Sequence, residues 1–199
     1  MPCTNHVIDI ISGVVGTVAQ KQLAALKAIN SDINAITFIY GSSNELVETL
    51  VQMDKSPSLK YNIWPAFLLF LDVSTETTTA ASRYPETTLQ MAIVMPTDPN
   101  YKAAERYEHV FEPILYPLWR EFIKQLADSG CFADYEATIR YTKYDRPYWG
   151  RKGNTLNEVV DAIELKDLTL KVLPGAQAPV VEPAEQFFDP EFFNVEFFK

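Results

Sequence analysis

The stretch from Ile63 to Val73 constrains the fold most strongly, because almost every residue in it is apolar. A strand of this kind is buried on both faces of its sheet, or packs one face on the core and the other on a neighbour. Pro65, near its beginning, predicts that the strand starts there or lies at an edge of the sheet. The chain is therefore expected to fold around a strand that is covered on both sides.

A second apolar pattern follows at Thr88–Met95, where large apolar side chains alternate with polar or smaller ones. A period of two predicts a strand, and the two strands together predict a long antiparallel hairpin. The residues between them, 74–87, are mostly polar and outnumber those of a common hairpin loop. We expect this connection to be a solvent-exposed projection that is functional or mobile.

Apolar residues at spacings of three and four predict two helices before this hairpin. The first covers 6–29 and the second about 43–54, with a strand at 35–40 between them. Ser42 and Glu45 have the spacing of a capping box, in which each side chain accepts a hydrogen bond from the other residue's backbone N–H. They therefore mark the beginning of the second helix.

The longest helix is predicted to begin after Asp98, which has the chemistry of an N-cap and is followed by a proline. It is predicted to end at Gly130. Pro113 and Pro117 lie inside its apolar pattern, and an interior proline removes a helical hydrogen bond. We therefore expect a kink near 110–116 or two consecutive helices.

Two further strands are predicted near 135–143 and at 162–173, with a possible bulge at Asp167. An aromatic loop at 144–150 and a polar stretch to Asp161 are expected to join them. The resulting order, α-β-α-β-β-α-β-β, predicts an α+β domain. Its sheet is mostly antiparallel, with about four to five strands, and helices pack on it.

The chain has 199 residues, which suits one domain. We assign 1–173 to the α+β domain and 174–199 to an extended acidic arm, whose prolines predict a semi-extended course.

The net charge is −9, and the arm carries five acidic side chains against one lysine. This balance argues against direct nucleic-acid binding, because phosphate contacts need a basic surface.

Cys3 and Cys131 lie too far apart in the sequence for a disulfide framework or a metal-binding spacing. This usage indicates folding in a reducing, cytosolic compartment. Residues 7–18 are apolar, but Asp9 interrupts them and no basic segment precedes them. Because the stretch is also too short to span a bilayer, we expect neither a signal peptide nor a membrane anchor.

The end of the arm contains three phenylalanine pairs in a five-residue repeat, which together hold half of the chain's twelve phenylalanines. Steps of five residues rotate successive pairs by about 140° around a helix, so no helical stripe forms. A disordered acidic tail is the alternative, but such tails are usually poor in aromatic residues. We predict that the pairs bind pockets on another surface. The residues concerned are Phe187, Phe188, Phe192, Phe193, Phe197 and Phe198.

The aromatic segment 144–150 contains Arg146, Tyr148 and Trp149, which we also predict to bind a partner. Packing of its aromatic rings against the sheet or a neighbouring subunit is favoured over stacking on a small ligand. Asp145 and Arg146 are predicted to orient this loop as a pair. We therefore expect Arg146→Ala to weaken assembly more than it weakens folding.

No catalytic, cofactor or metal site is indicated. His109 shares a helical face with Glu105 and Glu112, but a solvated charged face explains this spacing more simply than a metal site. The sequence contains no nucleophile elbow and no glycine-rich phosphate loop. Cys131 follows a helix end and lacks the electropositive surroundings of a reactive thiol. We predict that the protein is not an enzyme.

Four segments resemble tail-terminator or tail-completion proteins of long-tailed bacteriophages. They are IYGSSNEL at 39–46, KYNIWP at 60–65, DRPYWG at 145–150, and Asn157 with Asp161, Ala162 and Ile163 before the final strand. They accompany the long hairpin and the long helix. The resemblance covers roughly residues 5–173. The phenylalanine repeat departs from the common pattern of these small α+β proteins.

The resemblance implies a structural virion protein, made in the cytoplasm of a bacterial host and located in the tail or neck. Such a protein forms a homo-oligomeric ring, typically of six copies, that caps the tail tube and joins it to neck or head-completion proteins. Its subunits are expected to pair through exposed sheet edges and loops. A head–tail adaptor nearer the portal and a non-viral binding module of a bacterial complex are the alternatives.

Overall fold

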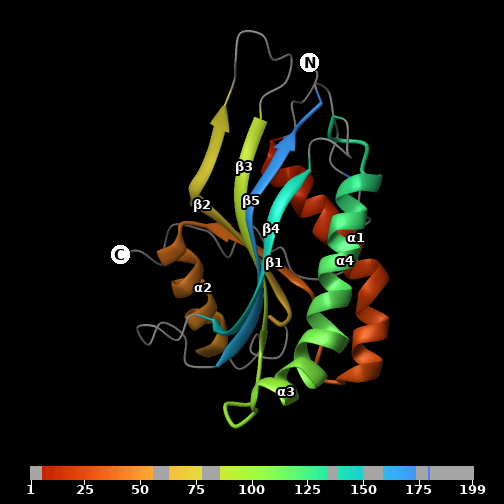
Figure 1. The fold of residues 1–199 in the computed structure, drawn as a ribbon, viewed down its shortest axis with the longest axis vertical. Coiled ribbons are helices and arrows are strands. Elements are labelled where there is room, and N and C mark those ends of the chain that lie inside the picture. The colour runs from red at the N-terminus through yellow and green to blue at the C-terminus, as the bar shows by residue number, and fades with distance from the viewer. Residues whose placement is uncertain are drawn as a thin grey trace.

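The computed structural model describes residues 6–55, 63–77, 86–133, 139–149, 159–173 and 179. Figure 1 shows a central sheet with α1 and α4 on one side and α2 on the other. This arrangement confirms the predicted α+β class and order of elements. The elements are α1 (Val7–Ile29), β1 (Thr37–Gly41), α2 (Ser43–Lys55), β2 (Ala66–Thr77), β3 (Glu86–Pro96), α3 (Ala103–Arg106), η1 (Tyr107–Leu115), α4 (Tyr116–Asp128), β4 (Arg140–Trp149) and β5 (Val160–Lys171).

The sheet has five described strands in the order β1-β2-β3-β5-β4. The β1 strand runs parallel to β2, and the other three pairings are antiparallel, so the expectation of a mostly antiparallel sheet is confirmed. Pro65 immediately precedes β2 and its carbonyl accepts a hydrogen bond from Thr37 N at 3.0 Å. The proline therefore marks the start of the strand, whereas the edge position is wrong because β1 lies outside β2.

The first five residues of β2, Ala66–Phe70, are buried on both faces, as the apolar run predicted, whereas the residues after Phe70 are partly or fully exposed. Phe67 and Leu69 belong to a core formed with α1, η1 and α4. Leu68 and Phe70 belong to a smaller core on the opposite face, to which α2 contributes. Because successive side chains of a strand point to opposite faces, one apolar segment supplies both cores.

The long helix begins at Ala103, so the predicted start at Asp98 is wrong. The Asp98 carboxylate accepts a hydrogen bond from Asn100 N at 2.8 Å, which closes a local turn instead of capping a helix. The helix start is stabilised by Glu105, whose carboxylate accepts a hydrogen bond from Lys102 N at 2.7 Å. The predicted end is confirmed, since α4 stops at Asp128 and Gly130 has a φ of 64°.

The interior prolines coincide with a change of helix type. The α3, η1 and α4 segments follow one another directly, and η1 is a π-helix that contains Pro113. Tyr116 N donates to the carbonyl of Phe111, five residues earlier. A π-helical turn contains an extra residue, which accommodates a proline that cannot donate its own hydrogen bond. The predicted disturbance at 110–116 is therefore present, as a π-helix between two α-helical segments.

The β2–β3 hairpin is more regular than the sequence predicted. Thr75, Glu76 and Thr77 were expected in a loop, but they pair with residues at the start of β3. Threonine favours strands and tolerates exposure, so polarity alone was a poor indicator of a loop here. The remaining connection, 78–85, lies outside the described residues.

The β4 strand runs from Arg140 to Trp149, so the loop predicted at 144–150 is wrong over its described part. Pro147 is tolerated because β4 lies at the edge of the sheet. Asp161 also lies in a strand, since β5 begins at Val160. The bulge predicted at Asp167 is confirmed by its φ of 54° and by a register shift against β4.

The N-terminus of α2 is attached to the sheet by two carboxylates. Glu45 accepts hydrogen bonds from Ser42 N at 2.7 Å and from its hydroxyl at 2.8 Å, while Glu45 N donates to Ser42 Oγ, which confirms the capping box. Asp72 of β2 accepts hydrogen bonds from the Ser43 hydroxyl at 2.7 Å and from Ser43 N at 3.2 Å. The backbone N–H of Ser42 lowers the pKa of Glu45, and the Ser43 hydroxyl lowers the pKa of Asp72.

These lowered pKa values predict acid sensitivity at this attachment. A carboxylate whose pKa is lower in the folded state stabilises the protein above its ordinary pKa, which is 3.8 for Asp72, and loses that contribution as the pH falls through the folded value. Asp72→Asn is expected to lower the urea midpoint at pH 7, and its difference from the parent should shrink below pH 3.8. Glu48→Gln on the exposed side of α2 is the control. A pH-independent difference would contradict the prediction.

Candidate interaction surface

The β4 strand is the outer strand on one side of the described sheet. Among the described strands it pairs with β5 alone, and it has ten residues, whereas β1 at the opposite edge has five. An edge strand carries unpaired backbone groups that can bind another chain. Its alternating side chains also extend over both faces of the sheet. The structure therefore places the segment richest in predicted partner-binding residues, apart from the arm, at the edge of the molecule.

Among the described elements, α2 covers only part of one face of the sheet. The α2 helix contacts β1 and β2, and Figure 1 shows it on that side of the sheet. The same face over β3, β5 and β4 carries polar and charged side chains, which we call the open sheet face. Its members are Glu86, Gln90, Arg140, Thr142, Tyr144, Arg146, Glu164, Lys166 and Lys171.

Glu164 lies at the centre of the open sheet face. Its carboxylate accepts a hydrogen bond from Gln90 Nε2 at 2.8 Å and another from Arg146 Nε at 2.9 Å. Lys166 Nζ lies 3.6 Å from the same carboxylate. Glu164 is buried, and a buried carboxylate requires such donors and cations around it. Removing any one of the three partners leaves two in place.

The outer part of this network is exposed. The Arg146 side chain is 42% exposed and that of Lys166 is 40% exposed. The Tyr144 ring is 38% exposed and lies 4.4 Å from the Arg146 guanidinium carbon, within the range of a cation–π interaction. Arginine beside an exposed tyrosine is typical of the residues that dominate protein–protein binding energy.

The open sheet face is cationic in a protein of net charge −9. Two further cations, Arg140 and Lys171, lie 3.9 and 3.4 Å from the carboxylate of Glu86. Four basic side chains therefore surround two acidic ones on this face. A surface with this excess of cations is electrostatically complementary to an acidic segment.

Asp145 points to the other face of the sheet. It accepts a hydrogen bond from the Tyr116 hydroxyl at 2.8 Å and forms an ion pair with Lys143. The Lys143 ammonium lies 4.8 Å from the centre of the Tyr116 ring. The prediction that Asp145 and Arg146 act as a pair is therefore wrong, because neighbours in a strand point in opposite directions.

Two tyrosines beside Asp145 have raised pKa values. Burial raises the pKa of Tyr116, and the hydrogen bond to the Asp145 carboxylate raises it further. Burial likewise raises the pKa of Tyr107, with an added contribution from the negative charge of Asp145. Both phenols therefore remain neutral at physiological pH. This cluster attaches β4 to the helical layer.

Tyr148 is partly buried and is held by several contacts within the molecule. Its backbone has a φ of 56°, and its N–H donates to Asp161 Oδ1 at 3.1 Å. Its hydroxyl donates to the carbonyl of Tyr101 at 3.2 Å, and its ring lies 3.6 Å from the guanidinium carbon of Arg106. These contacts give Tyr148 a structural role at the end of β4.

Arg106 and Asp161 form an ion pair that the sequence analysis missed. The Nη1–Oδ1 distance is 2.8 Å, and both side chains are 0% exposed. Arg106 also donates to the carbonyls of Tyr101 and Asp98. Arg106 lies four residues before the apolar Val110 and so falls on the buried face of the helix. This spacing is the signal in the sequence that could have identified Arg106 as a buried residue.

Trp149 packs against the α2-side core. Its ring centroid lies 6.1 Å from that of Phe70 in an edge-on arrangement, although two strands separate β4 from β2. Those strands carry Ala92 and Ala162 in this core, which leaves room for the indole. All three body residues predicted to bind a partner are partly buried, and Arg146, with a side chain that is 42% exposed, is the one that belongs to the open sheet face. The six arm phenylalanines lie outside the described residues.

Comparison with known protein families and with curated proteins finds no match. Within the described ranges, no group of three or more His, Cys, Asp or Glu side chains is placed to hold a metal ion. The His109 ring lies 5.1 Å from that of Tyr101. None of the helices described is both long enough and apolar enough to cross a membrane.

Proposed function

We propose that this chain is a structural virion protein that forms a ring at the end of a phage tail tube and joins the tube to neck or head-completion proteins. The observation that carries the proposal is the cationic open sheet face, which extends to β4, the outer strand of the described sheet. The resemblance of the four sequence segments described above supports the same assignment. The ring has a structural role and performs no catalysis.

The charge distribution suits contacts between two different surfaces of one chain. The open sheet face has a cationic excess, whereas the arm carries Glu182, Glu185, Asp189, Glu191 and Glu196 against one lysine. A contact between unlike surfaces on neighbouring copies is heterologous, and it closes into a ring when the rotation between subunits permits.

The experiment that tests this function measures the mass of the full chain alone and with the tail tube protein from the same genome. Mass photometry and electron microscopy should reveal ring-sized particles, and these should cap one end of the tube and stop its growth. A chain that stays monomeric at every concentration and ignores the tube would contradict the proposal. Binding to a portal-side protein without tube capping would instead support the adaptor function.

A further inference from the structure

A residue from the C-terminal segment lies against the first helix. Pro179 is next to Gly13 of α1, and a Cβ atom placed on Gly13 would lie 2.8 Å from the Pro179 carbonyl oxygen. It would also lie 2.9 Å from Cδ and 3.2 Å from N of the proline. Two of these three atoms are backbone, so the clash could not be relieved by moving a flexible side chain. Glycine at position 13 is therefore what permits this approach.

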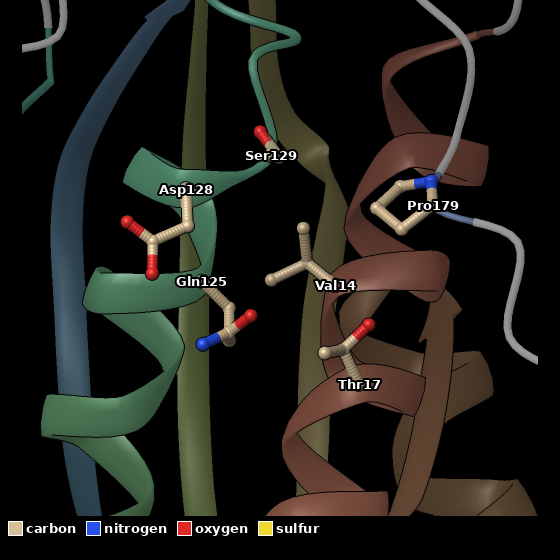
Figure 2. A pocket seen from close by; sticks show the side chains of 6 residues that line it. All are labelled: Val14, Thr17, Gln125, Asp128, Ser129 and Pro179. Carbon is tan, nitrogen blue, oxygen red and sulfur yellow. The ribbon is translucent and has the colours of Figure 1, made fainter.

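The contact borders a pocket of about 200 Å³ between α1 and α4. Figure 2 shows that α1 and α4 provide facing walls of this pocket and that Pro179 lies beside α1. The Thr17 hydroxyl in the wall donates to the Gly13 carbonyl at 3.0 Å, so the helix has no unpaired hydroxyl there. The lining residues are Val14, Thr17, Gln125, Asp128, Ser129 and Pro179.

We propose that Gly13 and this pocket form a docking site for the chain's own C-terminal segment, anchored at Pro179. Proline suits the position because it has no N–H group to leave unpaired against the helix, and its fixed φ lowers the cost of ordering the segment. The proposal concerns one chain alone and holds whether or not that chain forms a ring.

Chain lengths are consistent with this anchor. The body ends near Leu173, whose N–H donates to the Cys131 carbonyl at 2.9 Å, and six steps of extended chain reach about 20 Å from there to Pro179. The eight steps from Pro179 to Phe187 reach at most about 29 Å, and the nineteen steps to Phe198 about 68 Å. A compact body of this size has a radius of gyration of about 16 Å. An anchor at Pro179 would therefore give the first phenylalanine pair a shorter maximum reach than the last pair.

Gly13→Ala in the full chain tests the docking site because it separates the stability of α1 from the contact with Pro179. Alanine normally strengthens a helix relative to glycine, but here its Cβ would displace Pro179. Hydrogen exchange around residues 176–186 should become about tenfold faster or more, with no loss of protection in α1. Pro179→Gly should accelerate the same exchange without any change to α1.

Ala24→Gly, on an exposed part of α1, is the matched control. It weakens the helix and should leave exchange around Pro179 unchanged. Three results would overturn the proposal. They are unchanged exchange in Gly13→Ala, equal acceleration in Gly13→Ala and Ala24→Gly, and a parent chain whose linker exchanges as fast as an unfolded peptide.

Discussion

Arg106→Ala is expected to lower the free energy of unfolding by about 3–5 kcal/mol, because it leaves a buried carboxylate without its cation. Asp161 is 0% exposed and forms its ion pair with Arg106 at 2.8 Å. Its other oxygen, Oδ2, has no hydrogen-bond partner in the described part of the chain. The substitution also removes the guanidinium donors from the carbonyls of Tyr101 and Asp98.

Urea unfolding of the full chain measures this effect. Arg120→Ala, at an exposed position of α4, is the control and should change the unfolding free energy by less than about 0.5 kcal/mol. The loss of unfolding free energy in Arg106→Lys should lie between the losses in Arg106→Ala and Arg120→Ala, since lysine keeps the charge but cannot reproduce the guanidinium geometry. A loss in Arg106→Ala no larger than in Arg120→Ala would show that the buried pair does not stabilise the fold.

The ion pair also positions the candidate interaction surface. Asp161 accepts from Tyr148 N, and the Tyr148 ring packs on the Arg106 guanidinium, so the pair fixes the end of β4. The register of β4 against β5 then determines which side chains join the open sheet face, because a slip of one residue would exchange the two faces. Tyr144 and Arg146 lie on that face in the observed register. The buried charge pair thus holds the end of the strand that carries these two side chains.

The parts of the fold that depend on local chemistry could be predicted from the sequence. The strand around Phe67, which is apolar on both faces, is determined by its run of apolar residues. The capping box at Ser42 is determined by contacts between residues three positions apart. The start of the long helix was mispredicted because Asp98 forms a turn with Asn100 instead of capping a helix. That choice depends on competition between two local hydrogen bonds, which residue type alone does not decide.

The candidate site was harder to predict because it depends on strand position. Pro147 and its aromatic neighbours indicated a loop, but they are compatible with an edge strand. Once the segment is a strand, Asp145 and Arg146 must point to opposite faces. The Arg106–Asp161 pair joins residues 55 positions apart, a contact that no local pattern contains.

Arg146→Ala is expected to weaken assembly by about 2 kcal/mol, or roughly thirtyfold, as arginines at the centre of interfaces commonly do. The free energy of unfolding should fall by at most about 1 kcal/mol, because the ion pair with Glu164 is partly exposed. Glu164 keeps its hydrogen bond from Gln90 and its ion pair with Lys166 in the variant. The substitution therefore removes a cation from the open sheet face without leaving a buried charge unpaired.

A dilution series by mass photometry measures assembly, and urea unfolding of the same samples measures folding. Lys124→Ala removes a cation from the exposed side of α4, on the opposite side of the sheet, and should affect neither. If the chain assembles only on the tube, the dilution series is performed with tube protein present. Equal losses of assembly and folding in Arg146→Ala would assign Arg146 to the fold. Unchanged assembly would move the subunit contact away from the open sheet face, whereas a selective loss would make that face the site where copies meet.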